Sequence, residues 1–87
     1  MDNELKDYIT VRLGQVLSKS LEKTDKGLRA TARDDNSMDH SWLLKVLNGE
    51  KHIKVESLFS ICLAIGIKPS KILAEFEDEV FEKNKKF

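Results

Sequence analysis

The feature that most constrains the fold is a series of apolar stripes at helical spacing, separated by turn-forming residues. Between residues 5 and 21 apolar side chains recur every three or four positions, which is the repeat of one helix face. This stripe consists of Leu5, Tyr8, Ile9, Leu13, Val16, Leu17 and Leu21. It predicts a first helix of about four turns. No segment shows the two-residue alternation of a strand, so we expect an all-α fold.

A short second helix is expected after a polar stretch that ends at Gly27. Thr24 or Asp25 has the side chain of an N-cap for this helix. Its apolar content is low, and consists of Leu28, Ala30 and Ala32. Residues 34–37 read Asp-Asp-Asn-Ser, and these side chains bond to their own backbone, so a tight turn is predicted there.

A third helix follows this turn. Asp39 is predicted to be its N-cap, with Met38 as the apolar residue before the cap. Gly49, preceded by Asn48, occupies the position after a helix where a left-handed backbone is needed. The apolar stripe of this helix consists of Trp42, Leu43, Val46 and Leu47.

Two further helices are expected after a basic loop at residues 51–54. Residues 55–65 are apolar nearly all round and end at Gly66, which predicts a central core helix. Pro69 suits the first turn of a fifth helix, whose apolar residues are Ile72, Leu73, Phe76, Val80 and Phe81. A chain of 87 residues cannot bury two independent cores, so we expect one domain over residues 1–87. Its core would span 5–73, with a C-terminal helical extension at 74–87.

The residues that usually carry chemistry are few. Cys62 is the only cysteine, so one chain can form neither a disulfide nor a thiolate zinc site, and Cys62 is expected to be a small core residue. His40 and His52 lack companion metal ligands. His40 and Ser41 are neighbours on a helix and point about 100° apart, so they do not form a catalytic pair. With no glycine-rich phosphate loop either, we expect no enzyme, no metal and no cofactor.

The location of the protein is predicted from the same sequence. The first residues are acidic and carry no apolar run of the kind found in a secretory signal. No segment approaches the ~20 apolar residues of a membrane span. Together with the single cysteine, this favours a cytoplasmic protein without a membrane partner.

The order of these elements resembles the helix-turn-helix domain of Cro and phage-repressor proteins, the xenobiotic-response-element (XRE) family. The resemblance covers roughly Leu13 to Leu73 and is carried by two segments, MDHSWLLKVLNG at 38–49 and VESLFSICLAIG at 55–66. It implies a five-helix bundle of the lambda-repressor-like type, in which helix 39–47 enters the major groove of DNA. The function it implies is a sequence-specific DNA-binding transcriptional regulator, expected to act as a repressor.

The resemblance also implies site residues. Residues for base contact are His40, Ser41, Trp42 and Lys45. Residues for phosphate contact are Lys26, Arg29, Asn48, Lys51, His52 and Lys54. Ala32 would be the small residue that lets the second and third helices approach. Trp42 has an equal second interpretation as a packing residue, because a tryptophan at helical spacing with Leu43 and Val46 often belongs to the core.

The partners of such a regulator would be double-stranded DNA and a second copy of the chain. In a homodimer two recognition helices lie about 34 Å apart on the duplex. The predicted dimer interface consists of Phe76, Val80, Phe81 and Phe87, because these residues are more apolar than the end of a monomer requires. The 15 basic and 15 acidic residues cancel, however, which removes long-range attraction to DNA. This leaves an alternative function: a protein-interaction module on the same fold, such as an antitoxin or a partner-binding regulator.

Overall fold

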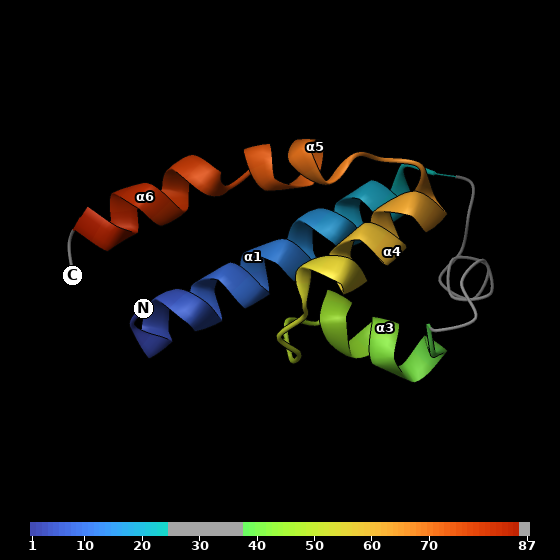
Figure 1. Cartoon of the computed structure of the whole chain (residues 1–87), viewed down its shortest axis with the longest axis horizontal. Helices are drawn as coiled ribbons and strands as arrows, with labels where there is room; N and C mark the ends of the chain where they lie inside the picture. Colours follow the sequence, from blue (N-terminus) through green and yellow to red (C-terminus); the bar gives the residue numbers. More distant parts are fainter. Residues whose placement is uncertain (25–37, 86–87) are drawn as a thin grey trace.

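The computed structural model describes residues 1–24 and 38–85, which form five α-helices and no strand (Figure 1). The helices are α1 (Asn3–Glu22), α3 (His40–Leu47), α4 (Val55–Ile65), α5 (Pro69–Ala74) and α6 (Glu77–Lys85). The prediction of an all-α fold is confirmed for these residues. The expected second helix and the turn at 34–37 lie outside the described residues, as do Lys26, Arg29, Ala32 and Phe87.

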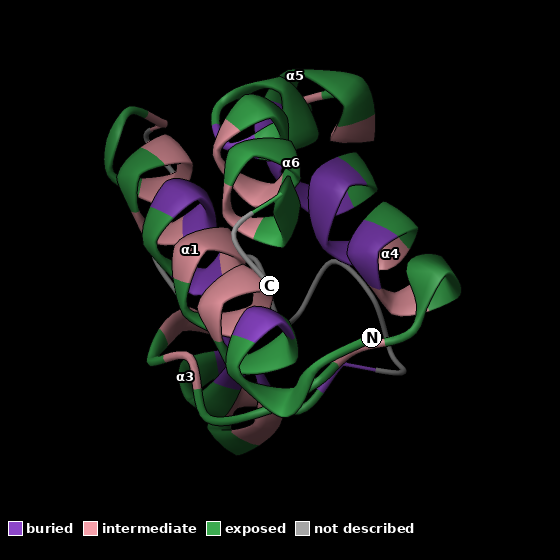
Figure 2. Cartoon of the chain, turned by 90° about the vertical axis from the view of Figure 1, so that its left-hand side faces the viewer, coloured by how far each residue is buried: buried purple, intermediate pink, exposed green. Residues whose placement is uncertain are grey.

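Helix α1 is the element around which the others are arranged. Asp2 caps it by accepting a hydrogen bond from the backbone N–H of Glu4 at 2.7 Å. Its buried side chains are those of Leu5, Val16 and Leu17, on the stripe that the sequence predicted. α1 packs against α3, α5 and α6. Both ribbon views show α1 between α3 on one side and the α5 and α6 segment on the other (Figures 1 and 2).

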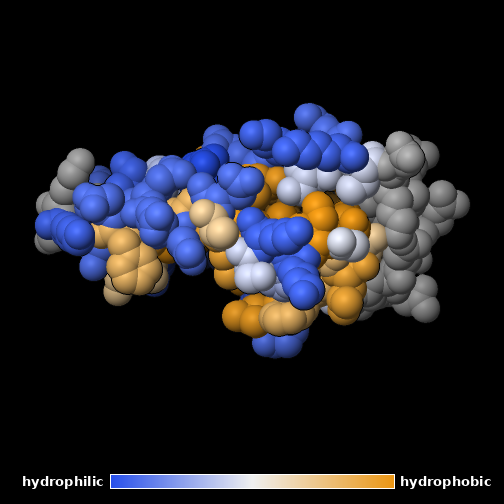
Figure 3. All heavy atoms as spheres, turned by 90° about the horizontal axis from the view of Figure 1, so that it is seen from above, coloured by the Kyte–Doolittle hydropathy of each residue, from blue (hydrophilic) through white to orange (hydrophobic). Residues whose placement is uncertain are grey.

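Helix α4 has an inner and an outer face, although it was expected to be buried nearly all round. Leu58, Ile61, Cys62 and Ile65 are buried, but Val55, Phe59 and Leu63 are 66, 50 and 81% exposed. The expectation was wrong because the elements packed against α4 cover only one side of it. Figure 3 shows hydrophobic side chains at the surface in the part of the molecule where α4 and α5 lie. As predicted, α4 ends at Gly66, whose φ of 77° is left-handed.

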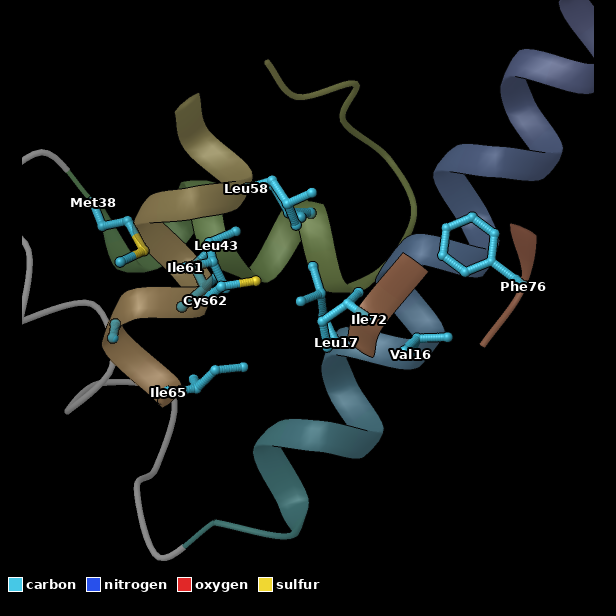
Figure 4. Close-up of a cluster of buried hydrophobic side chains, with 12 residues drawn as sticks. Val16, Leu17, Met38, Leu43, Leu58, Ile61, Cys62, Ile65, Ile72 and Phe76 are labelled. Carbon is cyan, nitrogen blue, oxygen red and sulfur yellow. The ribbon is translucent and has the colours of Figure 1, made fainter. Parts of the chain in front are cut away.

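The core lies where α1, α3, α4 and α5 meet. Figure 4 shows Leu17, Leu43, Ile61 and Ile72, one from each of these helices, converging in a single cluster. Cys62 belongs to this cluster, as predicted. Burial raises the pKa of its thiol to about 11, so little of the reactive thiolate exists at neutral pH.

The predicted fifth helix is divided in two. Pro69 does start α5, but the backbone N–H groups of Glu75 and Phe76 donate to the carbonyls three residues earlier, at 3.3 and 3.1 Å. This tight turn ends α5 at Ala74, and α6 begins at Glu77. The turn carries Phe76 into the core, where it is only 3% exposed. The burial of one aromatic ring thus accounts for a break that periodicity does not reveal.

Helix α6 has no buried residue of its own and is attached to α1 by a polar cluster. Arg12 donates from Nε and Nη2 to the Glu79 carboxylate at 3.1 and 3.0 Å, and the Tyr8 hydroxyl donates to the same carboxylate. The Lys83 Nζ lies 4.5 Å from the centroid of the Tyr8 ring. These bonds lower the pKa of Glu79, through Arg12 first and then Tyr8, and they raise the pKa of Arg12.

The titration of Tyr8 reports on this cluster, because it is the only tyrosine in the chain. Its hydrogen bond to Glu79 is the main reason that its pKa lies above 10.0. We therefore expect a spectrophotometric titration at alkaline pH to have its midpoint above 10.0, and the Glu79→Gln variant to bring it down. A Glu82→Gln variant, which changes a carboxylate not bonded to Tyr8, is the control and should leave the midpoint unchanged.

The same pKa shifts determine the pH range in which α6 is held most firmly against α1. The contribution of Tyr8 is present below pH 10 and is lost as pH rises through its raised pKa. The contribution of Glu79 is present above its usual pKa of 4.5 and is lost as pH falls through the lowered value. Equal Tyr8 midpoints in the parent protein and in Glu79→Gln would show that the cluster does not form.

Candidate nucleic-acid interface

The start of α3 is fixed by its own residues. The Asp39 side chain accepts a hydrogen bond from the backbone N–H of Ser41 at 3.1 Å, so the predicted N-cap is confirmed. Met38 is buried in the same cluster as Leu43, four positions into the helix from the cap. This is the arrangement of a hydrophobic staple, which sets the angle at which a chain enters a helix. Asp39 is thereby engaged with the backbone of α3.

The end of α3 is held by a close approach to α1. A Cβ atom at Gly14 would lie 2.6 Å from the carbonyl oxygen of Val46 and 2.8 Å from that of Leu47. The Ser18 hydroxyl donates to the Leu47 carbonyl at 3.4 Å. Gly49 has the predicted left-handed φ, 75°, and a Cβ there would lie 3.1 Å from the Cα of Val11. The small residues of α1 at positions 14 and 18 are the sequence signal for this contact, which the apolar spacing of α1 does not reveal.

The outer face of α3 is open to solvent. Its inner side chains, Leu43 and Val46, are buried in the core. Both ribbon views place α3 at one edge of the molecule (Figures 1 and 2). The exposed residues follow the spacing of one helix face and are Ser41, Leu44, Lys45 and Asn48. We call these four residues the α3 outer face.

The predicted base-contact residues do not all lie on this face. Ser41 and Lys45 are exposed and one helical turn apart. His40 and Trp42 are half-buried, and Trp42 packs against the core cluster and lines a hollow with Met38 and two serines of α4. The packing interpretation of Trp42 therefore has structural support. Leu44, which is 42% exposed, was missed, although the 3.6-residue repeat places it beside Ser41 and Lys45.

The predicted phosphate-contact residues continue from the end of α3 into the loop before α4. Asn48, Lys51, His52 and Lys54 are all exposed. In residues 1–24 and 38–85, neither Lys45 nor the two loop lysines forms an ion pair. His52 differs, because its Nε2 lies 3.7 Å from the Asp7 carboxylate of α1. Between residues 38 and 54 three lysines stand against two acids, a formal excess of one positive charge.

The predicted dimer interface is only partly at the surface. Phe76 was assigned to it wrongly, because the turn between α5 and α6 places its ring in the core. Val80 is half-buried and packs against the same cluster. Phe81 is 73% exposed. An aromatic residue near the end of the chain can therefore pack in the core, as Phe76 does, or lie at the surface, as Phe81 does. Sequence spacing alone does not distinguish the two positions.

Comparisons of this chain with protein-family models, with curated proteins and with solved structures give no match. Among the described residues there is no cluster of three or more histidine, cysteine or acidic side chains placed to hold a metal ion. None of the described helices has the length and apolar character of a membrane span.

Proposed function

We propose that this chain is a double-stranded DNA-binding transcriptional regulator of the XRE helix-turn-helix type, a repressor, in which α3 enters the major groove. The observation that carries the proposal is the combination of a firmly held inner face and an open outer face on one short helix at the edge of the molecule. The major groove is about 12 Å wide and admits one helix. A helix that reads DNA in this way must be held in place by its own domain. The Asp39 cap, the hydrophobic staple and the close contact with Gly14 supply that support.

Each residue of the α3 outer face has a role suited to its chemistry. Lys45 donates to the O6 and N7 acceptors of guanine, and Ser41 bonds to a base edge or a phosphate. Leu44 provides an apolar contact for the methyl group of thymine. Asn48, at the end of the helix, reaches the sugar-phosphate backbone.

The loop after α3 supplies the contacts that set register. Lys51 and Lys54 form no ion pair in the described structure and follow the end of α3 in the chain, so they bind phosphates beside the groove that α3 enters. His52 is engaged with Asp7 of α1, and its contribution depends on exchanging that carboxylate for a phosphate. Few phosphates are contacted, so we expect modest affinity for random DNA.

The test is a titration of the protein with duplex DNA, first with a random pool at increasing salt and then with the sequences that the pool enriches. Two or three phosphate contacts give a slope of log affinity against log salt of about −2 to −3. Lys54→Ala should reduce that slope by about 1 on every sequence. Lys45→Ala should cost about 1–3 kcal/mol on enriched sequences and much less on random ones.

The matched control is Lys71→Ala. Lys71 is also exposed, but it lies on α5, across α1 from α3 (Figure 1). Its removal should change neither the slope nor the discrimination. Equal losses from Lys45→Ala and Lys71→Ala would show that α3 is not the reading helix.

The alternative, a protein-interaction module on the same fold, is favoured by two observations. The chain has no net charge, and Leu44 gives the centre of the α3 outer face an apolar side chain. This alternative predicts that the protein does not bind random duplex DNA even at low salt, where phosphate contacts are strongest. The first titration therefore decides between the two functions.

A further inference from the structure

Helix α4 carries a stripe of large apolar side chains that point to solvent. Val55, Phe59 and Leu63 stand four residues apart, so they follow one another along a single face of the helix. We call these three residues the α4 stripe. Single exposed apolar residues are ordinary on protein surfaces, but a continuous series on one helix is typical of an interaction site.

The stripe continues into a groove at the carboxyl end of α4. Phe59 and Leu63 line this groove together with Cys62 and the segment from Gly66 to Pro69. Gly66 has open space around it, with no atom within 4 Å of the position where a Cβ would lie. The apolar surface is therefore longer than the helix, and it ends beside the charged side chain of Lys68.

We propose that the α4 stripe binds the α4 stripe of a second copy of this chain, with the two helices antiparallel. Phe59 is the middle residue of the stripe, so a twofold axis near it sets Phe59 against its own copy. The same axis sets Val55 against Leu63 of the second copy, since both lie four residues, about 6 Å, from Phe59. The stripe is thus complementary to itself in this direction.

The charges at the two ends of the stripe favour the same arrangement. Glu56 is the only charged residue within α4, and it lies at the amino end. Lys68 lies at the other end, on the edge of the groove. Antiparallel pairing brings Glu56 of each copy toward Lys68 of the other, whereas parallel pairing brings the two glutamates together. Lys54 precedes the helix as its N-cap and lies off the stripe.

The size of the surface indicates a weak dimer. A standard interface buries about 800 Å² on each partner, and the largest apolar patch on a monomer is about 300–600 Å². Three large side chains and one groove are few for a standard interface, so we expect the contact to be of the smaller size. We expect a dissociation constant on the order of 10–100 μM in the absence of any other partner.

Sedimentation equilibrium without DNA, from about 10 μM to about 1 mM, covers this range. We expect the parent protein to pass from monomer to dimer across it. Leu63→Glu should weaken the association at least about tenfold, because it places an unpaired carboxylate in an apolar contact. Phe81→Glu is the matched control. Phe81 is a large apolar side chain about as exposed as Leu63, but it lies on α6, so its replacement should leave the dissociation constant unchanged. Circular dichroism of each variant at low concentration checks that the helices are retained.

The charge pair provides the second, independent test. Glu56→Lys and Lys68→Glu should each weaken the dimer, and the double variant should restore it, because the double variant exchanges the two charges across the twofold axis. Three results would each overturn the proposal. The unmodified protein could stay monomeric at all concentrations, or Phe81→Glu could weaken association while Leu63→Glu does not. The double variant could also dimerise as weakly as the two single variants. No DNA is present, so the outcome is separate from that of the proposed function.

Discussion

Leu43→Ala is expected to destabilise the protein by about 2–5 kcal/mol, the usual range for truncating a fully buried leucine, while Leu44→Ala changes its stability by less than about 0.5 kcal/mol. The two leucines are neighbours in α3, but Leu43 is 1% exposed and Leu44 is 42% exposed. A small domain is stable by only about 5–15 kcal/mol, so the first variant loses a large part of that stability and the second very little. Urea unfolding followed by circular dichroism measures both.

The same pair tests which face of α3 is available for binding. If the α3 outer face contacts DNA, Leu44→Ala should weaken binding to enriched sequences without affecting folding. Leu43→Ala should leave the affinity of the folded fraction nearly unchanged. Similar losses of stability in both variants would mean that α3 is rotated from the orientation described here, and the residues assigned to its outer face would change with it.

Periodicity and caps were enough to predict the helices that bury one clear stripe. α1 and α3 follow from their apolar spacing, and Asp39, Gly49 and Gly66 have the chemistry that helix ends require. These features are local, because each depends on residues within about one turn of the chain. The sequence therefore determines them directly.

The features that sequence reasoning missed depend on contacts between distant segments. Phe76 turns inward because a space in the core receives its ring, and this divides the predicted fifth helix. Glu79 bonds to Tyr8 and Arg12, residues about 70 positions earlier in the chain. No spacing rule within a single helix reports such contacts.

The candidate site shows the same division between features that depend on nearby residues and features that depend on distant ones. Ser41 and Lys45 were predicted to contact bases, and both lie on the exposed α3 outer face, because helical phase follows from the buried stripe. Leu44 was left out of both the predicted apolar stripe and the predicted base-contact residues, although its helical phase places it on the exposed side. The assignment of Trp42 needed knowledge of the serines of α4 that lie beside it. Phase is predictable from sequence, whereas the neighbours that cover a side chain are not.

The contact between Gly14 and the end of α3 leads to an unusual prediction: alanine at this position should make the protein less stable than glycine does. In an open helix position, Gly→Ala stabilises by about 1 kcal/mol. Here the added methyl group would lie 2.6 and 2.8 Å from two backbone carbonyl oxygens, and backbone cannot rotate out of the way as a side chain can. We expect Gly14→Ala to destabilise the protein by about 1–3 kcal/mol, measured by urea unfolding.

Gly66→Ala is the matched control, because alanine at Gly66 meets only backbone strain, whereas alanine at Gly14 meets a lack of space. Gly66 has a φ of 77° and nothing near its absent Cβ, so alanine there costs about 1–2 kcal/mol through conformation alone. The two variants should differ in function. If α3 contacts DNA as proposed, Gly14→Ala should weaken DNA binding per folded molecule because it moves the end of α3, whereas Gly66→Ala should not. If Gly14→Ala were instead stabilising, α1 and α3 would not be in close contact, and the proposed function would lose the support that it requires for α3.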